Sequence, residues 1–142
     1  MVFYDDPRRE QIELMHEFMC IWADYWRDRP ACGVSITWVA MNSIRLWSKR
    51  KKEIEEAIVT GKPIRLTRTD TAIIAEKVRK LIHDQEAWKG HKRERDILTA
   101  YYLKVKPSFP QGKIAAILDC KPWQIDRLVK DSLYFMSQIW KD

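Results

Sequence analysis

Five side chains near the C-terminus have the types and spacing needed to bind a nucleic acid. They are Lys121, Trp123, Gln124, Arg127 and Lys130, which fall on one side of a predicted helix. Lysine and arginine donate to phosphate oxygens, and arginine and glutamine also donate to the acceptor edges of bases in a major groove. Gln124 and Arg127 are therefore candidates for base contacts, whereas the two lysines and Lys113 are candidates for phosphate contacts.

Trp123 has three interpretations at this stage. Its indole can pack on a thymine methyl group, pack on a sugar, or staple the turn that precedes the helix. Asp126 and Asp131 border the cationic set and reduce its net charge.

The stretch from Ser108 to Trp140 has the pattern of a helix-turn-helix, with the helix pair over residues 110–140. Two helices that cross steeply through a short turn need a small side chain where they touch, and Ala115 supplies it. The expected buried seam around it consists of Ile114, Leu118, Ile125 and Val129. Asp119 opens the turn where glycine is usual, and Pro122 suits the first position of the second helix. The alternative is an ordinary helix pair within a bundle.

Four further segments have helical periodicity and must position this unit. The expected helices run from about Pro7 to Arg27, from Ser35 to about Lys52, from a cap at Thr69 or Asp70 to about residues 86–88, and from Lys92 to a stop at Pro107. Gly61 and Pro63 punctuate residues 57–68, which we expect to form a linker or a small β-hairpin.

These elements predict an all-α fold of five to six helices, with a C-terminal helix-turn-helix like that of sigma region 4. We expect a single helical domain over residues 1–142. Residues 1–56 form its N-terminal helices, 57–68 the linker or hairpin, and 69–142 a bundle that contains the helix-turn-helix.

Two other groups of residues are candidate contact sites. Trp22 and Trp26 lie on an unusually wide apolar face of the first helix, which is either buried between two neighbours or a docking surface for a protein or a second copy. Lys49, Arg50, Lys51 and Lys52 form a run of cations that suits a phosphate backbone, although such a run is usually a solvated face.

Composition favours a protein that binds an anionic partner and argues against an enzyme. The 142 residues carry a net charge of +6. Acidic side chains outnumber basic ones in residues 1–30, so the positive charge lies in the rest of the chain. The scattered cysteines and histidines form no zinc-binding spacing, so we expect no metal and no cofactor. No catalytic pair, triad or glycine-rich phosphate loop stands out.

The N-terminus lacks the features of a secretion signal, and the uncharged runs are too short to span a bilayer. These observations favour a cytoplasmic protein that does not contact a membrane.

The order of several residues resembles the late-gene antitermination protein Q of lambdoid phages, the phage 21 type. The resemblance covers roughly residues 22–140. It is carried by a tryptophan-containing first helix, Asp70, Ala72, Leu81, the Tyr101–Tyr102 pair, Ile114–Ala115, Leu118 and Ile125.

The resemblance implies a non-enzymatic transcription factor of a bacteriophage, active in the bacterial host. Such proteins bind double-stranded DNA beside the late promoter, load onto a paused RNA polymerase and make it ignore later terminators. Nascent RNA is a further candidate partner of the protein, and so is a second copy of the chain. The competing interpretations are a sigma-region-4-like late activator and a DNA-binding subunit for phage assembly or packaging.

Overall fold

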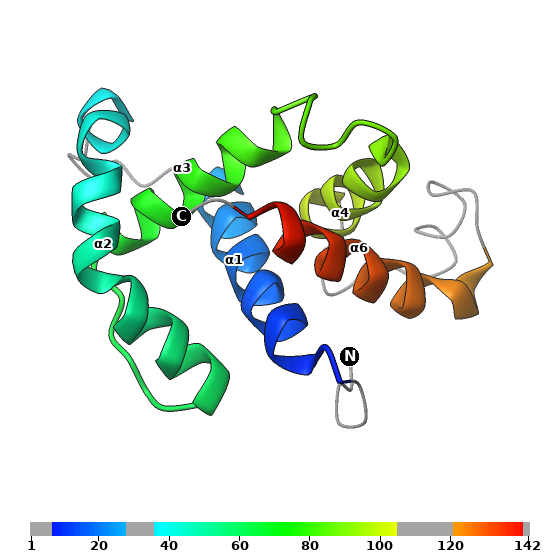
Figure 1. Cartoon of the computed structure of the whole chain (residues 1–142), viewed down its shortest axis with the longest axis horizontal. Helices are drawn as coiled ribbons and strands as arrows, with labels where there is room; N and C mark the ends of the chain where they lie inside the picture. Colours follow the sequence, from blue (N-terminus) through cyan, green and yellow to red (C-terminus); the bar gives the residue numbers. More distant parts are fainter. Residues whose placement is uncertain (1–6, 28–35, 105–120, 141–142) are drawn as a thin grey trace.

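The computed structural model describes residues 7–27, 36–104 and 121–140, and every regular element in these ranges is helical (Figure 1). The elements are α1 (Arg9–Arg27), α2 (Ile36–Thr60), α3 (Arg68–Ile82), α4 (Lys92–Lys104), the short 3-10 helix η1 (Pro122–Gln124) and α6 (Ile125–Ile139). The predicted all-α fold class is confirmed. The first helix of the predicted helix-turn-helix falls outside the described residues, as does Lys113, so this motif stays a prediction.

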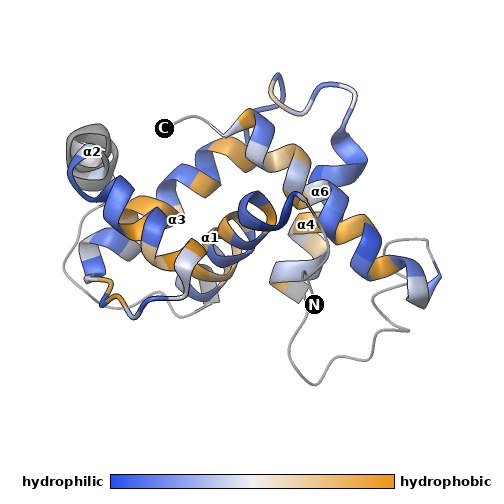
Figure 2. Ribbon diagram, turned by 60° about the horizontal axis from the view of Figure 1, so that its bottom comes forward, coloured by the Kyte–Doolittle hydropathy of each residue, from blue (hydrophilic) through white to orange (hydrophobic). Residues whose placement is uncertain are grey.

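Helix α1 is the centre of the fold and packs against α2, α3, α4 and α6 (Figure 1). Its buried side chains recur at steps of three and four residues, which places them along one side of a helix. They are Ile12, Met15, Phe18, Met19, Trp22 and Ala23. Figure 2 shows hydrophobic residues where α1 and α3 meet and polar residues on their outer sides.

The ring of Phe18 connects α1 to two elements that are distant in sequence. Its centroid lies 5.8 Å from Trp47 of α2 in an edge-on arrangement and 5.0 Å from Trp140. Aromatic pairs at these separations stabilise a core beyond the area that they bury. The C-terminal end of α6 is therefore held against the middle of α1.

Helix α2 is longer than the sequence analysis predicts, since it continues from Lys52 to Thr60. Ile54 and Ala57 are buried on its inner side, so packing extends the helix through a segment expected to be a linker. Gly61 then adopts a φ of 71°, a conformation that favours glycine, and ends the helix. Residues 62–67 contain no strand, so the loop is confirmed and the hairpin is wrong.

Helix α3 begins two or three residues earlier than predicted because Thr67, rather than Thr69 or Asp70, is its N-cap. The Thr67 hydroxyl accepts a hydrogen bond from the backbone N–H of Asp70 at 3.1 Å. In return, the Asp70 carboxylate accepts one from the N–H of Thr67 at 3.0 Å. This reciprocal capping box satisfies two N–H groups that an α-helix leaves unpaired.

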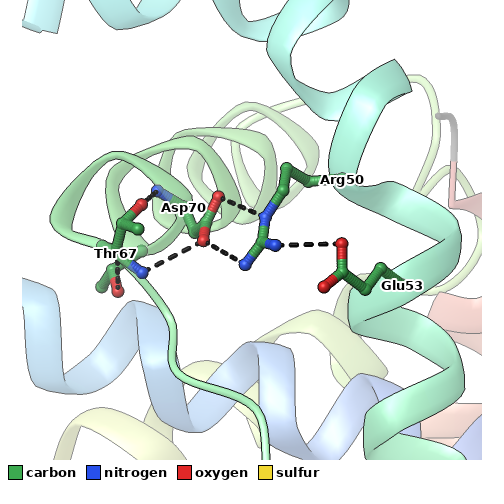
Figure 3. Close-up of polar contacts among 5 residues, drawn as sticks. Arg50, Glu53, Thr67 and Asp70 are labelled. Atoms are coloured by element: carbon green, nitrogen blue, oxygen red, sulfur yellow. Dashed lines mark hydrogen bonds and ion pairs between the residues drawn. The ribbon is translucent and has the colours of Figure 1, made fainter.

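Arg50 of the neighbouring helix α2 binds the carboxylate of this capping box (Figure 3). Its guanidinium donates to both oxygens of Asp70, at 3.3 and 2.9 Å, and also pairs with Glu53 at 3.0 Å. The Asp70 side chain is only 6% exposed. Burial alone would raise the pKa of Asp70, but hydrogen bonds from Arg50 and Thr67 outweigh it and hold the pKa below its ordinary value.

Helix α3 ends at Ile82, several residues before the predicted end near residues 86–88. Residues 85–90 instead form turns, which Trp88 anchors to the core. The Trp88 side chain is fully buried, and its indole N–H donates to the carbonyl of Leu81 at 2.8 Å. Helix α4 then begins at Lys92, as predicted.

The inner face of α6 matches the periodic pattern of the sequence. Ile125, Val129, Leu133 and Met136 are completely buried. This face packs against α1 and α4, so the opposite face of α6 points away from the core. Well-packed apolar neighbours therefore hold α6 in place, with the candidate DNA-contacting residues on its outer face.

Candidate nucleic-acid interface

The start of α6 and the preceding η1 lie at one end of the molecule, far from α2 (Figure 1). Two hydrogen bonds close the turn. The backbone N–H of Gln124 donates to the carbonyl of Lys121 at 2.9 Å, and the backbone N–H of Lys121 donates to Gln124 Oε1 at 3.1 Å. The amide oxygen of Gln124 therefore holds the turn. This changes its expected role, because a bidentate contact to adenine needs that oxygen as well as the amide N–H group.

Trp123 projects from this turn and is 72% exposed. Among the residues whose side chains the structure describes, Trp123 is the single large hydrophobic one that is exposed, whereas Trp22, Trp47 and Trp88 are buried. A tryptophan that stapled the turn would be packed against it, so the staple interpretation is wrong. The indole is open to a partner.

Arg127 and Lys130 are three positions apart in α6, a spacing that places them on one side of the helix, and Trp123 precedes Arg127 by four positions in η1. Arg127 is exposed and forms no hydrogen bond or ion pair with another described residue. Lys121 is also exposed, and Lys130 is half-buried. The structure thus brings together Lys121, Trp123 and Arg127 as an accessible group, which we call the α6 entry surface.

Asp126 lies beside this surface and is exposed. It occupies the first turn of α6, where a carboxylate is stabilised by the partial positive charge of the helix N-terminus. Asp126 therefore stabilises the start of α6. Its negative charge also reduces the positive potential of the α6 entry surface.

Farther along α6, the outward side is covered by an arginine that the sequence analysis did not single out. Arg8 pairs with Asp131 at 3.2 Å, and its guanidinium lies 4.9 Å from the centre of the Tyr134 ring. This contact neutralises the second of the two acidic side chains on this side of α6. Arg8 and Asp131 are 123 positions apart, so no local pattern could have indicated the pair.

We expect Arg8→Ala to weaken duplex binding by at most about fivefold, because Asp131 would become an unpaired anion near the phosphates. The measurement is fluorescence anisotropy with a labelled duplex. Arg8→Ala combined with Asp131→Asn should bind as tightly as Asp131→Asn alone. A loss that persists in the double variant would mean that Arg8 itself contacts DNA.

The run of cations in α2 does not join the α6 entry surface, since α2 lies at the opposite end of the molecule (Figure 1). Lys49 and Lys52 are exposed and Lys51 is half-buried. Arg50 is committed to Asp70 and Glu53, so its proposed phosphate contact is corrected to a structural role.

The tryptophans of α1 do not form the docking surface considered above. Trp22 is 5% exposed and belongs to the core, because α1 is covered by helices on several sides. The interface interpretation is therefore wrong for Trp22. The side chain of Trp26 lies outside the described residues.

A second polar group lies where α1 meets α4. His16 Nδ1 and the Tyr102 hydroxyl are hydrogen-bonded at 2.6 Å, and His16 Nε2 lies 3.7 Å from Cys20 Sγ. Burial lowers the pKa of His16 below 6.5, against the opposing effect of Glu17 and Glu13. Burial also raises the pKa of Tyr102, so its hydroxyl stays neutral. This group joins α1 and α4.

The lowered pKa of His16 predicts that the fold loses stability in mild acid. The unfolded chain binds a proton at His16 near pH 6.5, whereas the folded protein resists it, so this contribution is present above 6.5 and lost as the pH falls through the folded-state pKa. Urea unfolding between neutral and mildly acidic pH measures the effect. His16→Gln should show a shallower decline over this window, and an equal slope in both proteins would contradict the assignment.

The described ranges offer neither a metal site nor a membrane span. No group of three histidine, cysteine or carboxylate side chains there could hold a metal ion. None of the described helices is both long and apolar enough to cross a membrane. The α6 entry surface is therefore the strongest candidate that residues 7–27, 36–104 and 121–140 offer.

Comparison with known proteins does not assign a function to the α6 entry surface. No family model matches the chain, and no curated protein or solved structure is significantly similar to it.

Proposed function

We propose that this protein is a sequence-specific DNA-binding factor that acts as a phage late-gene transcription antiterminator. In this role it loads onto a paused bacterial RNA polymerase and makes the enzyme read through terminators. The observation that supports DNA binding is the α6 entry surface, where Arg127 and Lys121 flank an exposed Trp123. The antitermination step rests on the family resemblance of the sequence.

The close packing of the inner face of α6 supports recognition of a duplex. Ile125, Val129 and Leu133 anchor the inner face, so the helix backbone that carries the outward side chains is in place before DNA arrives. A surface that is already ordered loses less conformational entropy on binding. Arg127 is the side chain that we assign to a base edge, because its guanidinium can donate two parallel hydrogen bonds to guanine.

The cations on either side of Arg127 supply contacts that do not depend on sequence. Lys121 precedes the turn and Lys130 lies about one helical turn farther along α6, so the two can reach phosphates on either side of a contacted base pair. Each phosphate that a cation neutralises releases counterions, which makes binding weaken steeply with salt. The net charge of +6 acts in the same direction over the whole protein.

Transcription in vitro tests this function directly. The template would carry the cognate late promoter with its upstream DNA and a terminator downstream, and full-length transcript would be measured with and without the protein. We expect read-through that requires both the upstream DNA and an intact Arg127. Loss of read-through in Arg127→Ala, with folding retained, would link the α6 entry surface to the activity.

The same assay separates the two competing functions. A sigma-region-4-like activator would increase initiation and leave the terminated fraction unchanged. A packaging or assembly subunit would alter neither quantity and would form a large, stable oligomer in solution. Either result would overturn antitermination while leaving DNA binding to be judged separately.

A further inference from the structure

We propose that Trp123 stacks on an unpaired DNA base, so that the α6 entry surface prefers DNA with a locally open segment over a fully paired duplex. This inference rests on the proposed function, since it assumes that DNA is the partner. It adds the structural class of DNA that the surface selects.

The exposure of Trp123 is the first observation. The indole is 72% accessible, although Trp22, Trp47 and Trp88 in the same protein are at most 5% accessible. The exposed indole offers a flat aromatic face on which a planar partner can stack. Its backbone is held in η1 by the two hydrogen bonds between Lys121 and Gln124, which keeps the ring projecting from the start of α6.

The shape of the indole favours an unpaired base as the occupant. Inside a duplex, the faces of the bases are covered by their stacked neighbours, and a groove offers only base edges, sugars and the thymine methyl group. An unpaired base exposes its flat face, which an aromatic ring can cover almost completely. Binding of such a base therefore buries more of Trp123 than binding in a groove does.

The neighbouring charges identify the partner as a nucleic acid rather than a protein. Lys121 lies two positions before the ring, so it can contact a phosphate next to a stacked base. Arg127 lies four positions after the ring and adds a second exposed cation, whose base contact falls in the adjoining paired segment. Aromatic side chains between cations are the usual composition of surfaces that bind single strands. Hot spots of protein interfaces usually cluster with other anchor residues, whereas among the residues whose side chains the structure describes, Trp123 is the single exposed large hydrophobic one.

Competition binding with the full chain tests this inference. One labelled duplex would be compared with the same duplex containing a short internal mismatch bubble, with the single strand and with the corresponding RNA. We expect the bubble to bind about 5- to 150-fold more tightly than the duplex, the ratio expected for one base stacked on an aromatic ring. A fluorescent adenine analogue placed in the bubble should be quenched on binding.

Two variants separate the contribution of the Trp123 ring from that of the neighbouring cations. Trp123→Ala should reduce the preference for the bubble to about onefold and abolish the quenching, and this ratio of affinities reports stacking whatever the affinity for duplex alone becomes. Trp123→Phe should keep most of the preference, because a smaller aromatic ring still stacks. Because Trp123 is exposed, both variants should unfold at nearly the same urea concentration as the unaltered protein.

The outcomes separate this inference from the proposed function. Equal binding of bubble and duplex by the unaltered protein, or a preference that survives in Trp123→Ala, would overturn base stacking and leave duplex recognition intact. Failure to bind any DNA would overturn the proposed function as well. Tighter binding to RNA than to the DNA bubble would overturn the assignment to DNA.

Discussion

Replacing Asp70 with alanine is expected to lower the free energy of unfolding by about 2–4 kcal/mol, the largest effect that we predict on stability. The carboxylate caps α3 through Thr67 and accepts both hydrogen bonds from Arg50 of α2 (Figure 3). Its loss removes the capping box and leaves the guanidinium without its buried partner. Urea denaturation followed by circular dichroism measures the change.

Glu53→Ala is the matched control, because Glu53 pairs with the same guanidinium but is 63% exposed. Exposed ion pairs contribute little, so we expect a change below about 1 kcal/mol. The lowered pKa of Asp70 gives a second signature. Its contribution is fully present above the ordinary value of 3.8 and is lost as the pH falls through the folded-state pKa, so Asp70→Ala should flatten this part of the pH profile. Equal effects of the two alanine variants would contradict the structural role of Asp70.

Arg127→Ala is expected to remove about 1–3 kcal/mol of discrimination between DNA sequences, with little effect on folding. Arg127 is exposed and makes no hydrogen bond within the described chain, so its guanidinium is available to a base edge. Selection from a pool of random duplexes, followed by sequencing, measures the preference. The enriched motif of the unaltered protein should become flat at one position in the variant.

Lys121→Ala is the control for this prediction, because it removes a neighbouring exposed cation from the same surface. A phosphate contact carries no sequence information, so binding should weaken by a similar factor for all sequences and the dependence on salt should become less steep. A motif that is unchanged in Arg127→Ala, or that flattens equally in both variants, would contradict the assignment of Arg127 to a base.

Local periodicity was sufficient to predict the helices and most of the core. The steps of three and four between Ile125, Val129, Leu133 and Met136 predict the buried side of α6, and the opposite side follows from it. The prediction failed where packing overrides local preference. The Gly61 and Pro63 punctuation suggested a linker or hairpin over residues 57–68, whereas burial of Ile54 and Ala57 continues α2 as far as Thr60.

Long-range polar pairs could not be predicted from the sequence. Three residues at the start of α3 can each cap a helix, namely Thr67, Thr69 and Asp70, so the sequence does not identify the N-cap. Arg50, which binds the Asp70 carboxylate, lies twenty positions before it in the sequence. The contact of Arg8 with Asp131 joins opposite ends of the chain. In the candidate site, the outward positions of Trp123 and Arg127 follow from the helical pattern. The exposure of Trp123 and the turn-closing role of Gln124 depend on three-dimensional packing.

Titration of the isotope-labelled protein with a duplex, followed by NMR of the backbone amides, most directly tests whether the start of α6 contacts DNA. We expect the largest shift changes at residues 121–131, with α2 nearly unaffected, and we expect Arg127→Glu to suppress them. Shifts concentrated on α2 with residues 121–131 unchanged, or no shifts at any salt concentration, would contradict DNA recognition by this helix.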